Sequence, residues 1–420
     1  MLRTGDYLRG KKRSAMKKSV TGRRILSVNG ITLLFMMIYM VSYMTRVNFG
    51  AIVTEIEQVT MIPKALLSLS LTGSFVTYGI GQIVSGVCGD KFSPKKLISF
   101  GLSVTVLMNV LLPLCGDPYQ MLAIWSINGF AQAFMWPPLV RLMSVQLTSE
   151  EYNRSAVRIS WGSSFGSIAV YLLSPIVIVW MGWKAVFWLS ACVGIAGLVL
   201  WNIFCEDSTA VCIKKERTSA VSGKVFTPLM LIIMAAIVLQ GMMRDGVTTW
   251  VPSLISEIYN LGSTVSILSG VVLPIFAIIC YQGAALLYKK ITNPVMCACV
   301  IFGFGAFSAG MLYICTGKAV ALSVLFSALL TGAMHGVNLI LISMLPPYYK
   351  KQGKTATVSG VLNACTYAGS AISTYGVARL SGTIGWNKTI FVWVIIAAAG
   401  TLLCGLCAIP WKKAHPCPDE

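Results

Sequence analysis

Twelve long apolar stretches, separated by short polar segments, make up most of this chain. They are centred near residues 37, 78, 106, 132, 167, 193, 241, 276, 304, 331, 368 and 399. A stretch of about 20 apolar residues is long enough to cross the hydrocarbon of a bilayer as an α-helix. The pattern therefore predicts an all-α membrane protein with twelve transmembrane helices, embedded in the lipid bilayer.

The most polar internal segment divides these stretches into two groups of six. We expect a basic cytoplasmic tail (1–24), an N-terminal six-helix half (25–204), a cytoplasmic linker (205–228), a C-terminal six-helix half (229–410) and a second cytoplasmic tail (411–420). Two halves of this kind are expected to form a parallel repeat about an axis along the membrane normal.

Basic residues gather on one side of the predicted membrane. The chain has 33 Lys and Arg but only 14 Asp and Glu, which gives a net charge of +19. Most of these basic residues lie in the tails and in alternate loops, so the positive-inside rule places both termini in the cytoplasm. We expect a monomeric, multi-pass protein of the cell (inner) membrane. Because topology accounts for the charge, nothing in it indicates a nucleic-acid partner.

Two arginines lie inside apolar stretches at matching depths. A charge at mid-membrane costs at least about 3 kcal/mol unless something solvates it, so Arg46 either binds an anion in a water-filled cavity or extends to the headgroups. Arg244, in the seventh stretch, lies about as far beyond Lys224 as Arg46 lies beyond Arg24. This match favours a shared site for a small anion, and a planar guanidinium is well suited to phosphate.

Three further polar residues inside stretches each allow two interpretations. Asp245 either orients Arg244 or pairs with another group when the site is empty. Arg141 follows Trp136-Pro-Pro, which predicts a helix kink, and it either lines the path or extends to the membrane surface. His335 is either a proton relay or a hydrogen-bonded packing residue.

The segment that follows the second stretch carries a recognisable signature. From Gly86 it reads Gly-Val-Cys-Gly-Asp-Lys-Phe-Ser-Pro-Lys-Lys. An acid at a helix end, followed by a basic loop, can pair with neighbouring charges and helix ends and so hold one conformation. The segment resembles the loop signature of the major facilitator superfamily. The resemblance implies the major facilitator fold. We expect a conformational or gating role for Gly86, Asp90, Lys91, Arg141 and Asp245.

Three segments narrow the resemblance. They are Tyr43-Met-Thr-Arg-Val-Asn-Phe, the run from Gly129 through Trp136-Pro-Pro to Arg141, and Met243-Arg-Asp-Gly-Val-Thr-Thr-Trp-Val-Pro. Together they resemble the organophosphate:phosphate antiporter family, which includes glycerol-3-phosphate and hexose-6-phosphate transporters. The resemblance implies exchange of an organic phosphate for inorganic phosphate, with Arg46 and Arg244 at the positions of the family's two phosphate-binding arginines.

The expected substrate site departs from the family pattern at three positions. Gln82 replaces a common lysine, Ser163 replaces the histidine of glycerol-3-phosphate members, and Thr249 replaces an acid. A less charged site puts glycerol 3-phosphate, and phosphate as counter-substrate, in doubt. The full set of expected substrate-binding residues is Arg46, Arg244, Tyr43, Tyr78, Gln82, Ser163, His335, Asn363 and Tyr367.

Two other functions stay open at this stage. One is proton- or sodium-coupled symport of a carboxylate such as a sugar acid, and the other is a sensor on the same fold that binds a sugar phosphate without moving it. An enzyme is not expected, because the sequence has neither a nucleophile motif nor a phosphate-cradling loop. We expect no cofactor and no metal, and we interpret the 13 cysteines as small buried hydrophobes.

Overall fold

The computed structural model describes residues 27–62, 64–206, 226–260 and 263–414, and every regular element in this part of the chain is a helix. The expected tail 1–24 and most of the expected linker 205–228 lie outside the described residues. The elements of the N-terminal half are α1 (Val28–Ala51), α2 (Val53–Thr60), α3 (Lys64–Lys91), α4 (Pro94–Leu111), η2 (Leu112–Leu114), α5 (Pro118–Gln132), α6 (Trp136–Gln146), α7 (Ser149–Met181) and α8 (Trp183–Phe204).

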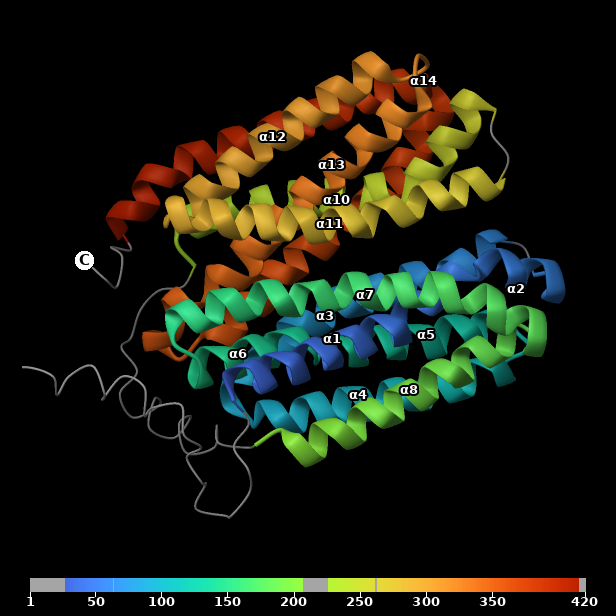
Figure 1. Cartoon of the computed structure of the whole chain (residues 1–420), viewed down its shortest axis with the longest axis horizontal. Coiled ribbons are helices and arrows are strands. Elements are labelled where there is room, and N and C mark those ends of the chain that lie inside the picture. Colours follow the sequence, from blue (N-terminus) through green and yellow to red (C-terminus); the bar gives the residue numbers. More distant parts are fainter. Residues whose placement is uncertain (1–26, 63, 207–225, 261–262, 415–420) are drawn as a thin grey trace, which may run out of the picture.

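The C-terminal half contains fewer but longer elements. They are α10 (Pro228–Tyr259), α11 (Ser263–Lys290), α12 (Pro294–Cys315), α13 (Val320–Asn338), η3 (Leu339–Met344), η4 (Pro346–Gln352) and α14 (Thr355–Ala414). Figure 1 shows the two halves as separate bundles that lie against each other along their length.

Each predicted stretch falls in a helix of the structure. α14 contains two successive helices, because Gly385 has a φ of 79° and so breaks the helix in a conformation that favours glycine. In the described residues nine helical stretches are long and apolar enough to span a membrane. The remaining predicted spans are α3, the α5–α6 pair and the first part of α14, which are interrupted or rich in small and polar residues.

The predicted kink in the fourth span is a complete break. α5 ends at Gln132 and α6 begins at Trp136, with proline in its first turn. Proline is tolerated there because the first N–H groups of a helix have no partner within the helix. After the break, α6 packs against α3 and α14.

Buried amides join the helices of the N-terminal half. The Asn48 side chain on α1 donates to Asn109 Oδ1 on α4 at 2.8 Å and to Ser190 Oγ on α8 at 3.0 Å. Asn109 in turn donates to the Thr45 carbonyl at 3.0 Å. All four residues are buried, and hydrogen bonds between helices are a normal way to stabilise packing within a membrane.

α13 runs into a π-helical turn, η3, near one end of the bundle. Two successive carbonyls of this turn accept hydrogen bonds from other helices: Ile342 O from Ser359 Oγ at 3.4 Å, and Ser343 O from the Tyr152 hydroxyl of α7. The second bond joins the two halves. We call this end, which carries Lys91, Lys289 and Lys350, the basic end of the bundle; it lies on the left in Figure 1.

Candidate functional site

Arg46 lies in a pocket of aromatic rings. Its guanidinium carbon is 4.3 Å from the ring centroid of Tyr43 and 4.8 Å from that of Tyr78. Its Nη1 donates to the Tyr367 hydroxyl at 3.3 Å. Within the described residues no carboxylate forms an ion pair with Arg46. The positive charge is therefore stabilised by two ring faces and one hydroxyl, which solvate a cation more weakly than a carboxylate does.

Arg244 on α10 has a different environment. Its Nε and Nη2 donate to the two carboxylate oxygens of Asp245 at 2.7 Å and 2.8 Å, in a bidentate pair. The same carboxylate accepts a hydrogen bond from Ser370 of α14. Asp245 thus holds Arg244 in one orientation and at the same time pairs with a second group, Ser370. The pair leaves Arg244 only 7 % exposed.

Tyr367 brings the two arginines together. Its hydroxyl accepts from Arg46 of the N-terminal half, and its ring centroid is 5.6 Å from the guanidinium carbon of Arg244 in the C-terminal half. The ring of Tyr78 packs against it at a centroid distance of 4.4 Å. Residues more than three hundred positions apart along the chain therefore meet between the halves.

A small cavity opens beside this cluster. Its volume is about 10 Å³, which is room for roughly one water molecule. Its lining residues are Tyr39, Tyr43, Trp136, Ser160, Arg244, Tyr281, Asn338, Asn363 and Tyr367. A ligand larger than water can enter only if the aromatic side chains, and the halves that carry them, move apart.

Three aromatic residues of this cavity, Tyr39, Trp136 and Tyr281, are not among the substrate-binding residues predicted from the sequence. The ring of Tyr39 packs edge to face against Tyr43 and at a tilt against Trp136, with ring centroids 5.2 Å and 4.8 Å apart. It lies four residues before Tyr43 and therefore on the same face of α1, which is a signal that the sequence did contain. Tyr281 lies in the middle of an apolar helix, and nothing around it in the sequence indicates a site.

His335 reaches the cavity only through Tyr281. The Tyr281 hydroxyl and His335 Nδ1 are 3.0 Å apart, and the two rings meet edge to face. His335 does not itself line the cavity. This geometry fits the hydrogen-bonded packing interpretation, and a direct role of His335 in substrate binding stays a prediction.

Gln82 links the halves rather than facing the cavity. Its Oε1 accepts from Asn363 Nδ2 at 3.0 Å, and its Nε2 donates to the Ala133 carbonyl at 3.2 Å. Gln82 is fully buried. Ser163 donates to the Ser160 carbonyl of its own helix at 2.7 Å and is absent from the cavity lining. Contact of these two side chains with substrate stays a prediction.

Asp90 connects the halves at the basic end. Its two carboxylate oxygens accept from the backbone N–H groups of Ala356 at 2.9 Å and Thr357 at 2.7 Å, in the first turn of α14. A carboxylate at a helix N-terminus gains up to about 2 kcal/mol in partly buried geometries. Arg141 Nε lies 3.9 Å from Asp90. Arg141 is 1 % exposed, so its alternative placement at the membrane surface is wrong.

Glycines let α3 and α14 meet backbone to backbone around Asp90. A Cβ atom added to Gly86 would lie 2.7 Å from the Ala356 carbonyl oxygen, and one added to Gly360 would lie 2.2 Å from the Gln82 carbonyl oxygen. Side chains at either position would force the halves apart at the basic end. Lys91 follows Asp90 at the exposed end of α3.

The family model described as Major Facilitator Superfamily matches residues 35–374, which is most of the chain. This chain belongs to the major facilitator superfamily. The resemblance and the fold class expected from the sequence are therefore confirmed. The chain is a multi-pass membrane protein of a superfamily of transporters rather than of enzymes.

Solved structures of the superfamily share its fold over nearly the whole length. The proton:xylose symporter XylE, bound to 6-bromo-6-deoxy-D-glucose, superposes with a TM-score of 0.71 at 14 % identity and covers 93 % of this chain and 96 % of its own. The human organic anion transporter MFSD10 (TETRAN) also has a TM-score of 0.71, at 13 % identity, covering 90 % of this chain and 98 % of its own. These likenesses concern the fold alone.

Curated relatives match a shorter region. A probable hexose phosphate transport protein of Chlamydia pneumoniae is 28 % identical over 166 residues, which is 39 % of this chain and 36 % of that protein. The membrane sensor protein UhpC of Escherichia coli K12 is 24 % identical over 167 residues, which is 39 % of this chain and 38 % of that protein. The chain thus spans little more than a third of the length of the relatives it matches.

Proposed function

We propose that this chain is a secondary active transporter that moves an organic phosphate across the membrane, in exchange for inorganic phosphate, by alternating access. The observation that carries the proposal is the meeting of Arg46 and Arg244, one from each half, at Tyr367. An anion held by both arginines would draw the halves together, which is how binding energy can drive a change between two conformations.

The charge at the site favours phosphate over a neutral sugar. Two guanidinium groups face one carboxylate, Asp245, so the cluster keeps an excess positive charge. Each guanidinium can donate two parallel hydrogen bonds to adjacent oxygens of one phosphate group. The hexose phosphate transport proteins among the relatives support the same substrate class.

We further propose that the basic end faces the cytoplasm, as the distribution of Lys and Arg predicts. The structure is then closed toward the cytoplasm, and Asp90 and the glycine contacts of α3 with α14 act as the gate. A reporter enzyme fused after Glu420 should be active only on the cytoplasmic side. Activity outside the cell would reverse the assignment of the gate.

A second candidate function is a sensor that binds a sugar phosphate without moving it. The match to the membrane sensor protein UhpC favours this alternative. Both functions use the same two arginines, so the site cannot separate them. A measurement of flux separates the two functions, because a sensor would show saturable binding and no uptake.

The deciding experiment is uptake into liposomes that contain the purified protein and are loaded with phosphate. Labelled hexose 6-phosphate should accumulate only when phosphate is inside, and a labelled sugar acid should not. Uptake of the sugar acid driven by a proton or sodium gradient would replace the proposal with symport. Binding without uptake of either compound would establish the sensor.

A further inference from the structure

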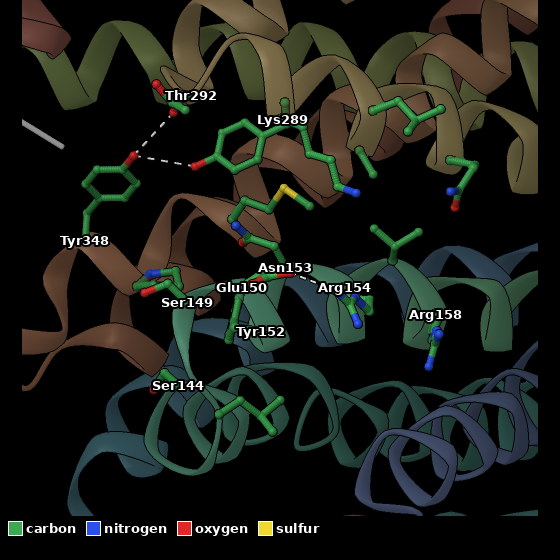
Figure 2. Close-up of a pocket in the computed structure, with 18 of the residues that line it drawn as sticks. Ser144, Ser149, Glu150, Tyr152, Asn153, Arg154, Arg158, Lys289, Thr292 and Tyr348 are labelled. Atoms are coloured by element: carbon green, nitrogen blue, oxygen red, sulfur yellow. Dashed lines mark hydrogen bonds and ion pairs between the residues drawn. The ribbon is translucent and has the colours of Figure 1, made fainter. Parts of the chain in front are cut away.

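A second, larger cavity lies between the halves at the basic end, away from Tyr367. Its volume is about 520 Å³. It opens between the first turns of α7 in one half and the last turns of α11 in the other, and η4 closes one end (Figure 2). Four cations line it: Arg154 and Arg158 on α7, Lys289 on α11 and Lys350 on η4.

This cavity carries an excess positive charge. Its one acidic lining residue, Glu150, pairs with Arg154 at 2.8 Å. Arg158 donates to Asn29 Oδ1 at 3.1 Å, a contact that leaves its charge uncompensated. In the part of the chain that the structure describes, no carboxylate forms an ion pair with Lys289 or Lys350. Figure 2 shows Lys289 and Arg154 on facing sides of the cavity.

A hydrogen-bond donor in the cavity wall has no acceptor. The indole Nε1 of Trp161, one turn beyond Arg158, is buried and has no hydrogen-bond partner among the described residues. A buried donor without a partner costs about 1–3 kcal/mol, so an acceptor on a bound ligand would be favourable there. Tryptophan is also typical of the depth at which headgroups meet hydrocarbon.

Apolar stripes lead from this basic cavity along the membrane. On α7 the face of Arg154 and Arg158 continues through Trp161 to Phe165 and Leu172, of which the last two are exposed. On α11 the face of Lys289 continues through the exposed residues Leu286, Ile279 and Ile275. Positions spaced three or four apart share one helix face, so each stripe runs straight along its helix.

We propose that this cavity binds an anionic phospholipid of the leaflet at the basic end. The phosphate of the headgroup meets the four cations and the Trp161 indole, and the acyl chains lie along the stripes of α7 and α11. The lipid contacts both halves, so it stabilises the conformation in which the basic end is closed. This proposal does not depend on which substrate the central site binds.

The test measures lipid retained by the purified full-length protein in detergent that contains equal amounts of phosphatidylglycerol and phosphatidylcholine, by native mass spectrometry. The wild type should retain phosphatidylglycerol preferentially. Lys289→Gln and Arg158→Gln should each reduce its occupancy about fivefold, which corresponds to about 1 kcal/mol per basic residue near a lipid surface. Trp161→Phe keeps an aromatic ring and should reduce it about tenfold, through loss of one hydrogen bond to a charged group.

The matched control is Lys413→Gln, an exposed lysine at the same end of the bundle on α14. It should leave retention unchanged. Equal retention of the two lipids, an equal loss in the control, or displacement of phosphatidylglycerol by millimolar inorganic phosphate would each overturn the proposal. The last outcome would indicate a site for a free anion. Lys289→Gln keeps the test valid if Arg158→Gln fails to fold, because the Lys289 side chain forms no hydrogen bond or ion pair with the described part of the chain.

Discussion

The two arginines that meet at Tyr367 come one from each half and have different environments. Arg46 is surrounded by the rings of Tyr43 and Tyr78 and has no carboxylate partner in the described part of the chain. Arg244 is held by both oxygens of Asp245. One positive charge is therefore available to an arriving anion, whereas the other is already neutralised.

This difference suggests a division of labour between the halves. In the proposed transport cycle, the uncompensated charge of Arg46 would supply most of the attraction that brings an anion into the site. Arg244 is kept in a fixed orientation, and an anion must compete with Asp245 for its hydrogen bonds. Competition of this kind limits how tightly a transporter holds its cargo and so favours release on the other side of the membrane.

The largest effect should come from replacing either arginine by lysine. Lysine keeps the charge but loses the two parallel hydrogen bonds, and each charge-assisted bond is worth about 1.5 kcal/mol or more, so Arg46→Lys and Arg244→Lys should each lower uptake about a hundredfold. The double mutant should be little worse than either single mutant, because an anion held from one side no longer links the halves. Uptake into liposomes at matched protein content measures all three.

Arg379→Lys is the control for this series, because Arg379 is exposed and lies outside the site. It should transport at the wild-type rate. Near-normal flux in either site mutant would remove that arginine from the substrate site, and independent, additive losses would mean that the two arginines do not share one anion.

A smaller effect, which is a gain in affinity for phosphate, is expected for Asp245→Asn. Asparagine keeps the shape of the side chain and removes the negative charge that competes for Arg244, so binding of inorganic phosphate should tighten about tenfold while exchange becomes slower. Calorimetry on the purified protein gives the affinity and the liposome assay gives the rate. Weaker binding would show that Asp245 acts only to orient Arg244. It would contradict the idea that Asp245 competes with the anion for this arginine.

The smallest effect is expected at Gln82, which bridges to Asn363 between the halves. Gln82→Lys adds a positive charge near the site and should tighten binding of doubly charged phosphates about threefold more than that of monocarboxylates, because Coulomb attraction scales with ligand charge. Gln82→Met has similar length without charge and should not discriminate between the two ligands. Equal shifts for both ligands in Gln82→Lys would exclude position 82 from the electrostatics of the cavity.

The sequence predicted the helices and the charged residues of the site because both leave direct signals. Apolar length marks a span, and a charge inside a span is rare enough to stand out, as with Arg46 and Arg244. The role of Asp90 at a helix end was also predictable, although its partner, the first turn of α14, was not. An acid next to a basic loop can be recognised within one short segment of sequence. The helix that Asp90 caps begins 265 residues later, at Thr355, and no local pattern links the two.

Rotation of the helices about their axes accounts for what the sequence did not predict. Tyr281 faces the cavity and Gln82 faces Asn363 because of how α11 and α3 are turned toward their neighbours. Hydrophobic periodicity normally fixes such rotations in soluble proteins, but a helix that is apolar on all sides carries little of this signal. The positions of aromatic and amide side chains in the site therefore required the structure.

The π-helical turn Leu339–Met344 has a mechanical consequence for opening at the basic end. A π turn holds one residue more than an α turn and widens the helix, so carbonyls around it can turn to partners outside the helix, as Ile342 O and Ser343 O do. Separation of the halves would break the bond from Tyr152 to Ser343. Rewinding of this turn to α geometry would give the released carbonyl a partner within its own helix. The extra residue of the π turn would thus let the basic end open without leaving a backbone carbonyl unsatisfied in the membrane.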